Sequence, residues 1–323
     1  MTRFSWALSA LVLIAGCKKQ PAAPPPPEIA EVRVVYKGAD LPGAPKLDVA
    51  ALTAAARAAI AASSGVPVRE DGGTDARRAR RYRLRVELEI GSAEDPIAKK
   101  GNLRALVDAK LSPIGGEPGA LSFEQSALAE RAYTPGKPGE PAWQAHAERA
   151  IKDCVGGVGA RIKLAGGDAN AIIAAIDGSD DDLCEEGMRL AAERKETRAV
   201  PALIRRLKSD DHAERDRAIG ALAAIGDRRA VRPLTEVAKF NDLTDLPKVL
   251  DALATIGGPE ARSYLEFVAS GHDNPEMREL AKQALGHLDR REAERQRDLG
   301  APDTRLSRRH AAGQPFGSSS DKP

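Results

Sequence analysis

The most regular pattern in the chain is a strict alternation of apolar and charged residues at positions 81–90. Apolar side chains from Tyr82 to Ile90 take every second position, and arginine or glutamate takes the positions between them. Because successive side chains of a strand point to opposite faces, the pattern predicts a strand with one buried and one solvated face. Positions 103–111 repeat the alternation, and a weaker third run covers 121–132. Gly- and Pro-rich segments separate these runs, which favours an antiparallel meander.

A strand and a helix precede this meander. The β-branched residues of positions 29–36 predict the strand, and Asp48 can cap a helix that runs to about Ala62.

A second helix follows the meander. Pro141 suits its first turn, and it runs to about Leu164. One stripe of this helix consists of Trp143, Ala147, Ala150, Cys154, Val158 and Ile162. Three glycines between 156 and 159 weaken the helix and leave room for a break there. The order β-α-β-β-β-α over residues 29–165 predicts a small α+β domain with two helices on one face of a sheet.

The second half of the chain repeats itself at an offset of 31 residues. The segment AVPALIRRL at Ala199 aligns with AVRPLTEVA at Ala230, and ALAAIGD aligns with ALATIGG. Four units result, at residues 168–198, 199–229, 230–260 and 261–291. Each unit predicts two helices, and in the second unit Asp210 or Asp211 can cap the second helix and Gly226 can end it. One such pair cannot bury its apolar stripes alone, so the units are expected to stack.

Two segments of this repeat resemble a known family. ERDRAIGALAAIGDRRAVRPL and DNPEMRELAKQALGHL are similar to the short bacterial HEAT repeats of phycobilisome-lyase-like proteins. Arg215 and Arg278 match the arginine that the family carries early in its second helix, and Asp227 matches the acid after its Ile-Gly. The first and third units depart from the family in that region, where they carry Cys184, Gly187, Leu246 and Pro247. The resemblance implies an α-helical HEAT-type solenoid over residues 168–291. With the small α+β domain before it, the expected fold class is multi-domain.

The resemblance also implies a curved surface, formed largely by the second helices, on which protein partners bind. Its candidate contact residues are Arg215, Lys248 and Arg278. The alternative is that the arginines pair with loop acids such as Asp211 or Asp273 and brace neighbouring units.

The N-terminus has the pattern of an export signal. A basic Arg3 precedes an apolar stretch at 4–15, which is too short to span a bilayer as a stable helix. The stretch ends on LIAGC, which resembles a bacterial lipobox with Cys17 as the acylated residue. The alternative is an ordinary secretory signal with an incidental cysteine. Residues 1–16 are therefore predicted to be a lipoprotein signal peptide, and residues 17–28 a lipidated cysteine and Pro-rich tether of about 30 Å.

Acyl chains such as palmitate on Cys17 would hold the protein at a membrane, since each buried methylene contributes about 0.8 kcal/mol. Lys18 follows the cysteine. In enteric bacteria an aspartate there retains lipoproteins in the inner membrane, so we expect the outer membrane of the cell envelope, with the protein facing the periplasm.

Composition and charge narrow the functional classes. The chain has 49 lysine and arginine residues and 47 aspartate and glutamate residues, so its net charge is +2. This near balance gives no sign of a nucleic-acid partner. The arginine run from Arg77 to Arg85 is read as a solvated loop and the wet face of a strand, with a basic patch as the alternative.

For Cys154 and Cys184, a disulfide that joins the two domains and buried free thiols both remain open. Residues 292–323 are polar and predict a short helical extension and then a disordered tail.

No motif for catalysis or cofactor binding is recognised, so we expect no enzyme, no cofactor and no metal site. The acidic run Asp177, Asp180, Asp181 and Asp182 lacks the spacing of a calcium loop, and helix capping explains it better. The expected function is a lipid-anchored periplasmic adaptor that binds envelope proteins through its repeats. The alternative is a lipoprotein that binds an envelope ligand or polymer through the α+β domain, with the solenoid as support.

The lipobox generates the first prediction. In Cys17→Ala the acylated thiol is lost, so the precursor should keep its full size and take up no labelled fatty acid. Gel mobility and metabolic acyl labelling measure both. Unchanged processing with continued labelling in this variant would show that Cys17 is not the lipidated residue.

Overall fold

The structure, a computed structural model, describes residues 27–69, 80–115, 120–237 and 243–300. It divides into two compact units, Met1–Val158 and Gly159–Pro323, here called the α+β unit and the helical unit. The division falls within helix α2 (Trp143–Ala165), ahead of the boundary expected at 165. The predicted signal peptide, Cys17 and nearly all of the tether lie outside the described residues.

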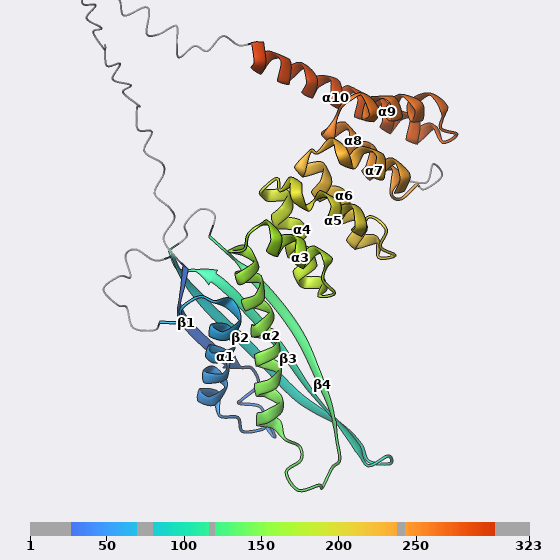
Figure 1. Ribbon diagram of the computed structural model, residues 1–323. Coiled ribbons are helices and arrows are strands. Elements are labelled where there is room, and N and C mark those ends of the chain that lie inside the picture. The colour runs from blue at the N-terminus through green and yellow to red at the C-terminus, as the bar shows by residue number, and fades with distance from the viewer. Residues whose placement is uncertain (1–26, 70–79, 116–119, 238–242, 301–323) are drawn as a thin grey trace, which may run out of the picture. The chain divides into compact units, whose positions relative to one another are not determined.

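A four-stranded sheet forms the body of the α+β unit (Figure 1). Its strands are β1 (Pro27–Tyr36), β2 (Arg80–Asp95), β3 (Lys100–Pro113) and β4 (Phe123–Tyr133). They lie side by side in chain order, and β2, β3 and β4 form the predicted antiparallel meander. β1 pairs with β2 in parallel, and helix α1 (Val49–Ser64) provides the crossover that a parallel pair needs.

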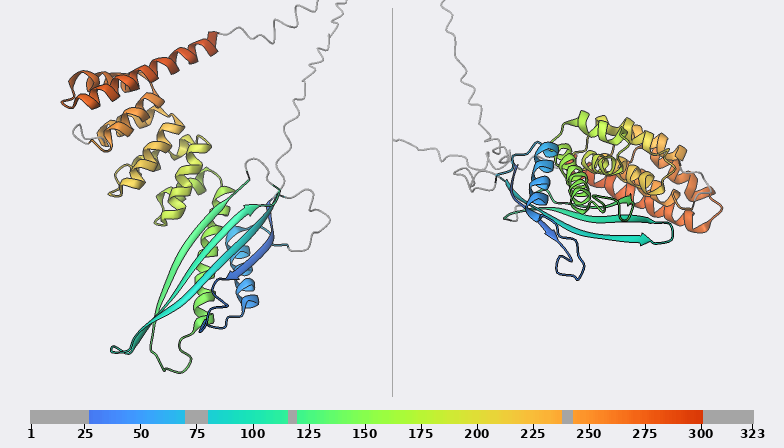
Figure 2. Two further views of the ribbon diagram at one scale, coloured as in Figure 1. Left: turned by 180° about the vertical axis from the view of Figure 1, so that it is seen from behind. Right: turned by 90° about the horizontal axis from the view of Figure 1, so that it is seen from below.

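Both helices of this unit cover one face of the sheet (Figure 2). Asp48 caps α1 as expected, because its side chain accepts a hydrogen bond from the Ala51 amide at 3.0 Å. The Sγ atom of Cys154 in α2 lies 3.6 Å from the Val107 carbonyl and 3.5 Å from the Gln125 carbonyl, so α2 packs over β3 and β4. The face between helices and sheet is the core of the unit. Its fully buried sheet residues include Leu84, Val86, Leu88, Leu103, Ala105 and Val107.

The other face of the sheet is charged, and several of its arginines pair with glutamates on the same or the neighbouring strand. Arg83 on β2 contacts Glu31 on β1 at 2.5 Å, and Arg104 on β3 contacts Glu130 on β4 at 2.8 Å. Basic residues from Arg81 to Arg85 therefore form part of a mixed-charge strand face, as expected for its solvated side. Arg77 and Arg78 lie outside the described residues.

Two expectations for α2 are corrected. The helix runs unbroken from Trp143 to Ala165, although it contains three glycines that allowed for a break. A Cβ on Gly157 would lie 2.5 Å from the Oε1 atom at the flexible end of the Gln125 side chain on β4. Pro141 is not in the first turn; it precedes the helix, after a cis peptide bond with Glu140.

In its described residues, the helical unit contains four helix pairs after the end of α2 (Figure 1). They are α3 (Ala169–Asp177) with α4 (Asp181–Glu193), α5 (Val200–Arg206) with α6 (His212–Ile225), α7 (Val231–Val237) with α8 (Leu246–Ile256), and α9 (Pro259–Gly271) with α10 (Pro275–Gly300). One pair falls in each 31-residue span of the sequence repeat. Asp211 caps α6, and Gly226 ends it at a φ of 75°. Thus the local helix signals of the second unit act as predicted.

The second helices pack on one another in series, α4 on α6, α6 on α8 and α8 on α10. One apolar cluster runs through all four pairs, from Leu164 at the end of α2 to Leu288 in α10. α10 continues past the last repeat to Gly300, so the start of the polar segment at 292 is helical.

Two glycines in second helices have opposite surroundings. A Cβ on Gly187 of α4 would lie 3.1 Å from Ile176 Cγ1 and 3.3 Å from the Ile172 carbonyl oxygen, both on α3. This close approach explains why the first unit departs from the family at that position. A Cβ on Gly220 of α6 would meet no atom within 4 Å.

This contrast predicts stability changes of opposite sign. Gly187→Ala should lower the free energy of unfolding by about 1–3 kcal/mol, because the added methyl group overpacks the α3–α4 contact. Gly220→Ala, the matched control, should raise it by up to about 1 kcal/mol through helix propensity alone. Urea unfolding followed by circular dichroism measures both. Equal midpoints for Gly187→Ala and the wild type would contradict the close contact between α3 and α4.

Candidate functional site

Arg215, the first candidate for partner binding, has a mostly buried side chain. It lies in the first turn of α6, and its side chain is 14% exposed. Nη1 donates to the carbonyl of Ser209 at 2.6 Å, and Nε donates to Oδ2 of Asp245 at 3.2 Å. Arg215 therefore joins the second helix pair to the start of α8 in the third.

Asp245 is the centre of a charged cluster between these pairs. Its side chain is 3% exposed and lies immediately before α8. Two further side chains approach its Oδ1 atom. His212 Nδ1 lies 3.8 Å from Asp245 Oδ1, and Lys248 Nζ lies 3.9 Å from it. We call these four residues the Asp245 cluster. A carboxylate this buried is stabilised only when cations and hydrogen bonds compensate its lost hydration.

Lys248, the second candidate, also bridges neighbouring helices. Its Nζ lies 2.5 Å and 2.6 Å from the two carboxylate oxygens of Asp216 on α6. An equivalent pair, Glu185 with Arg217 at 3.0 Å, joins α4 to α6. Both members of the second pair lie 31 residues before those of the first, so the same tie recurs at successive repeats.

Arg278, the third candidate, braces its own loop. Its Nη1 donates to the carbonyls of His272 at 2.5 Å and Asp273 at 3.0 Å. Arg215 holds the carbonyl six residues before it in the same way. These contacts favour the bracing alternative, but with other acceptors than expected, because neither arginine pairs with the carboxylate of Asp211 or Asp273.

Both cysteines that follow Cys17 are free and buried. Each sulfur contacts carbonyl oxygens within its own unit, and for Cys184 this is the carbonyl of Ile176 at 3.4 Å. Burial raises the pKa of the Cys184 thiol to about 11, so the reactive thiolate is scarce at neutral pH. The structure thus contains the free-thiol alternative and not the bridge.

The acidic run has structural partners. Asp180 caps α4 by accepting from the Leu183 amide at 3.0 Å, and Asp177 pairs with Arg205 at 2.7 Å. Within the described part of the chain, no three His, Cys, Asp or Glu side chains come together as a metal site would require.

An exposed position recurs on all four second helices. Its members, at the repeat offset of 31 or 32, are Arg189, Gly220, Asp251 and Gln283. We call this set the exposed row. It lies three to five residues after the braced positions Arg215, Lys248 and Arg278. Sequence reasoning overlooked it because no residue type is shared along it.

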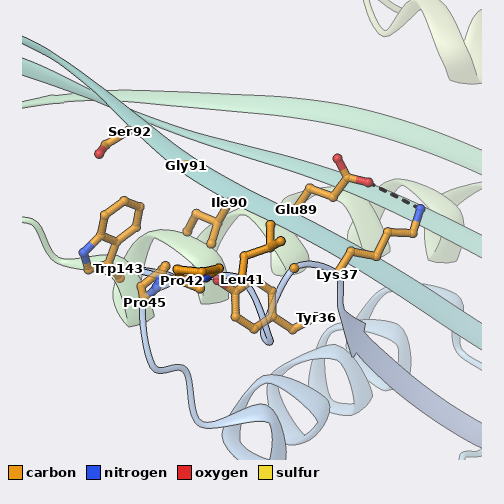
Figure 3. Close-up of a pocket in the computed structure, with 13 residues that line it drawn as sticks. Tyr36, Lys37, Leu41, Pro42, Pro45, Glu89, Ile90, Gly91, Ser92 and Trp143 are labelled. Atoms are coloured by element: carbon orange, nitrogen blue, oxygen red, sulfur yellow. Dashed lines mark ion pairs between the residues drawn. The ribbon is translucent and has the colours of Figure 1, made fainter.

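The α+β unit contains a cleft that sequence reasoning also missed. Its volume is about 610 Å³, and it lies where the end of β1, the β1–α1 loop, β2 and the start of α2 meet. Tyr36 and Trp143 stand at two sides of it, with Leu41, Pro42 and Ile90 between them (Figure 3). The signal in the sequence was a rare tryptophan at a helix start, which we assigned to the apolar stripe of that helix.

Comparisons with known proteins bear on the repeats. Residues 214–240 match the PBS lyase HEAT-like repeat, which supports a HEAT-repeat domain in the helical unit. No curated protein sequence matches the chain. Among solved structures, a PelC dodecamer from Paraburkholderia phytofirmans is 14% identical, with a TM-score of 0.26, and the match covers 44% of this chain and 92% of that one. Among the helices that the structure describes, none has the length and apolar character to cross a membrane.

The Asp245 cluster predicts a large effect for one arginine and a small one for its neighbour. Arg215→Ala should lower the free energy of unfolding by about 3 kcal/mol, because it leaves a buried carboxylate without its closest cation. Arg217→Ala breaks only the exposed pair with Glu185 and should cost less than about 1 kcal/mol. Urea unfolding of each variant measures the difference.

A second substitution isolates the charge. Adding Asp245→Asn to Arg215→Ala removes the buried carboxylate and should restore part of the lost stability. If Arg215→Ala unfolds like Arg217→Ala, Arg215 does not brace the two pairs.

Proposed function

We propose that the chain is a lipid-anchored envelope adaptor whose HEAT-type solenoid, residues 168–291, binds protein partners. The observation that carries the proposal is the serial packing of α4, α6, α8 and α10, which leaves one exposed row across all four pairs. The HEAT-like match at residues 214–240 supports the solenoid, since stacked repeats of this kind use their extended surfaces for binding.

The exposed row replaces Arg215, Lys248 and Arg278 as the contact surface. Those three side chains are engaged with neighbouring groups, and removing them from these contacts would cost stability. Arg189 at the start of the row is likewise paired, with Glu186 and Glu193, so the open part of the row is Gly220, Asp251 and Gln283. These three combine a small, an acidic and an amide residue, which can meet different groups of a partner. A partner segment laid along the stack would cross the four second helices in order.

The location is proposed from the N-terminal pattern. Acyl chains on Cys17 would anchor the chain, and the tether would place the α+β unit within about 30 Å of the membrane surface. Lys18 after the cysteine favours the periplasmic side of the outer membrane. The proposal assigns no catalytic step, cofactor or nucleic-acid partner to the chain.

One observation favours a second candidate function, the binding of an envelope ligand or polymer by the α+β unit. This observation is the 610 Å³ cleft with Tyr36 and Trp143 in its walls. In this candidate the repeats serve as support.

The adaptor function is tested by blocking the exposed row. Gly220→Arg places a long side chain in open space in the middle of the row, so the fold should be retained and partner capture lost. Gly271→Arg is the matched control, because Gly271 at the end of α9 also has open space around a Cβ and lies outside the row. Crosslinking in envelope preparations, followed by quantitation of the captured proteins, measures the effect.

Melting temperatures of both variants should stay near that of the wild type. Equal capture by Gly220→Arg and the wild type would move the binding surface away from the second helices. If Gly220→Arg and Gly271→Arg lose partner capture equally, the loss does not depend on the exposed row, and the row is not the binding surface.

A further inference from the structure

The cleft of the α+β unit is a site that the adaptor function does not use. About half of its lining is apolar, and this half is formed by Leu41, Pro42, Pro45 and Ile90 beside the two aromatic rings. Leu41 is 66% exposed, although it is a large aliphatic side chain. Exposed apolar surface of this kind, concentrated in one concave place, is typical of a binding site.

The polar atoms of the cleft are of two kinds. Lys37 at its rim is already paired, with Glu87 at 2.5 Å and Glu89 at 3.5 Å. By contrast, the Trp143 indole N–H and the Tyr36 hydroxyl have no hydrogen-bond partner within the described ranges. The cleft therefore offers two aromatic faces, an aliphatic strip and two unused donors.

These features fit a polyproline II segment. Such a segment has three residues per turn and no internal hydrogen bonds, so its carbonyl oxygens can accept from tryptophan and tyrosine donors. Its proline rings pack on aromatic-lined grooves, and its stiffness lowers the entropy lost on binding. A glycan of the same size would need hydrogen-bond partners for many hydroxyl groups, whereas a polyproline II segment presents only carbonyl acceptors.

The chain itself carries such a segment. Pro24 to Pro27 are four consecutive prolines, with Pro21 shortly before them. They cannot reach the cleft of their own copy. β1 runs from Pro27 to Tyr36, so its start lies about 30 Å from the cleft at about 3.3 Å per residue, and the prolines adjoin that start.

We propose that the cleft binds the proline-rich tether, residues 18–27, of a second copy of this chain. Trp143 and Tyr36 hold the proline rings and donate to backbone carbonyls, and Leu41 closes the aliphatic strip. Confinement of copies on one membrane would raise the effective concentration of tether around each cleft, which favours a contact too weak to persist in dilute solution.

Trp143 gives a direct readout. The chain contains two tryptophans, Trp6 and Trp143, so a protein that begins at residue 18 has Trp143 alone. We would replace Pro24, Pro25 and Pro26 by alanine in this protein, so that it supplies no tether of its own. A synthetic peptide of residues 18–28 should then change the emission of Trp143 saturably, whereas the same peptide with Pro24–Pro27 replaced by alanine should not.

Two exposed leucines make a matched pair for the specificity of this signal. Leu41→Ser should weaken peptide binding about tenfold, the loss expected for one buried aliphatic side chain. Leu243→Ser changes a leucine that is 54% exposed in the helical unit and should leave the affinity unchanged. Tyr36→Phe removes the hydroxyl donor and should also weaken binding without disturbing the fold.

Three results would overturn the proposal. The first is the absence of a saturable change, or an equal change with the alanine peptide. The second is a Leu41-dependent change with oligosaccharides of N-acetylglucosamine and none with the peptide, which would make the cleft a carbohydrate site. The third comes from sedimentation equilibrium. Residues 18–323 with natural prolines should self-associate more strongly than the alanine variant, and equal association would exclude a second copy as the occupant.

Discussion

A pair of short helices cannot bury its own apolar stripe, and the organisation of the helical unit follows from that constraint. Each second helix covers the one before it, so a single core runs from Leu164 to Leu288. Because the stripes recur every 31 residues, the polar residues beside them also recur in register. The ties from Glu185 to Arg217 and from Asp216 to Lys248 are one interaction made at two successive interfaces. The stacking that buries the core thus also brings these charges together across successive interfaces.

The sequence predicts the order of strands and helices in the α+β unit because apolar residues repeat with a period of about two residues in a strand and about 3.6 in a helix. What it misses are the contacts between elements. The helix α2 continues through its glycines while it packs over β3 and β4, and no local pattern encodes that packing. The strands β2 and β3 extend to Asp95 and Lys100, past the end of the apolar alternation at Ile90, because backbone pairing alone carries the hairpin onward. Its far end is held by Tyr133, which lies over Gly101 and donates to Glu94 at 2.5 Å.

The candidate site could be predicted only in part, for a related reason. Sequence alignment identifies Arg215 and Arg278 as equivalent, and the structure gives both a bond to the carbonyl six residues earlier. The carboxylate that completes the role of Arg215 is Asp245, thirty residues further on, immediately before α8. The third unit lacks the family arginine, so the family motif does not identify Asp245 as a partner of Arg215. A residue whose partner lies in the next repeat shows in the sequence only as an isolated charge.

The distribution of aromatic residues separates the two units further. Aromatic residues make up only 3% of the chain, so the position of each ring can be considered individually. In the α+β unit Tyr82 and Phe123 are buried in the core, and Tyr133 is fixed by Glu94 and Gly101. Only Tyr36 and Trp143, among the described rings of this unit, have neither a core position nor a polar partner, and both line the same cleft. The helical unit instead offers a row of mostly polar residues. The two units therefore expose surfaces of different chemistry, an aromatic-lined cleft in the α+β unit and a mostly polar row on the second helices of the helical unit.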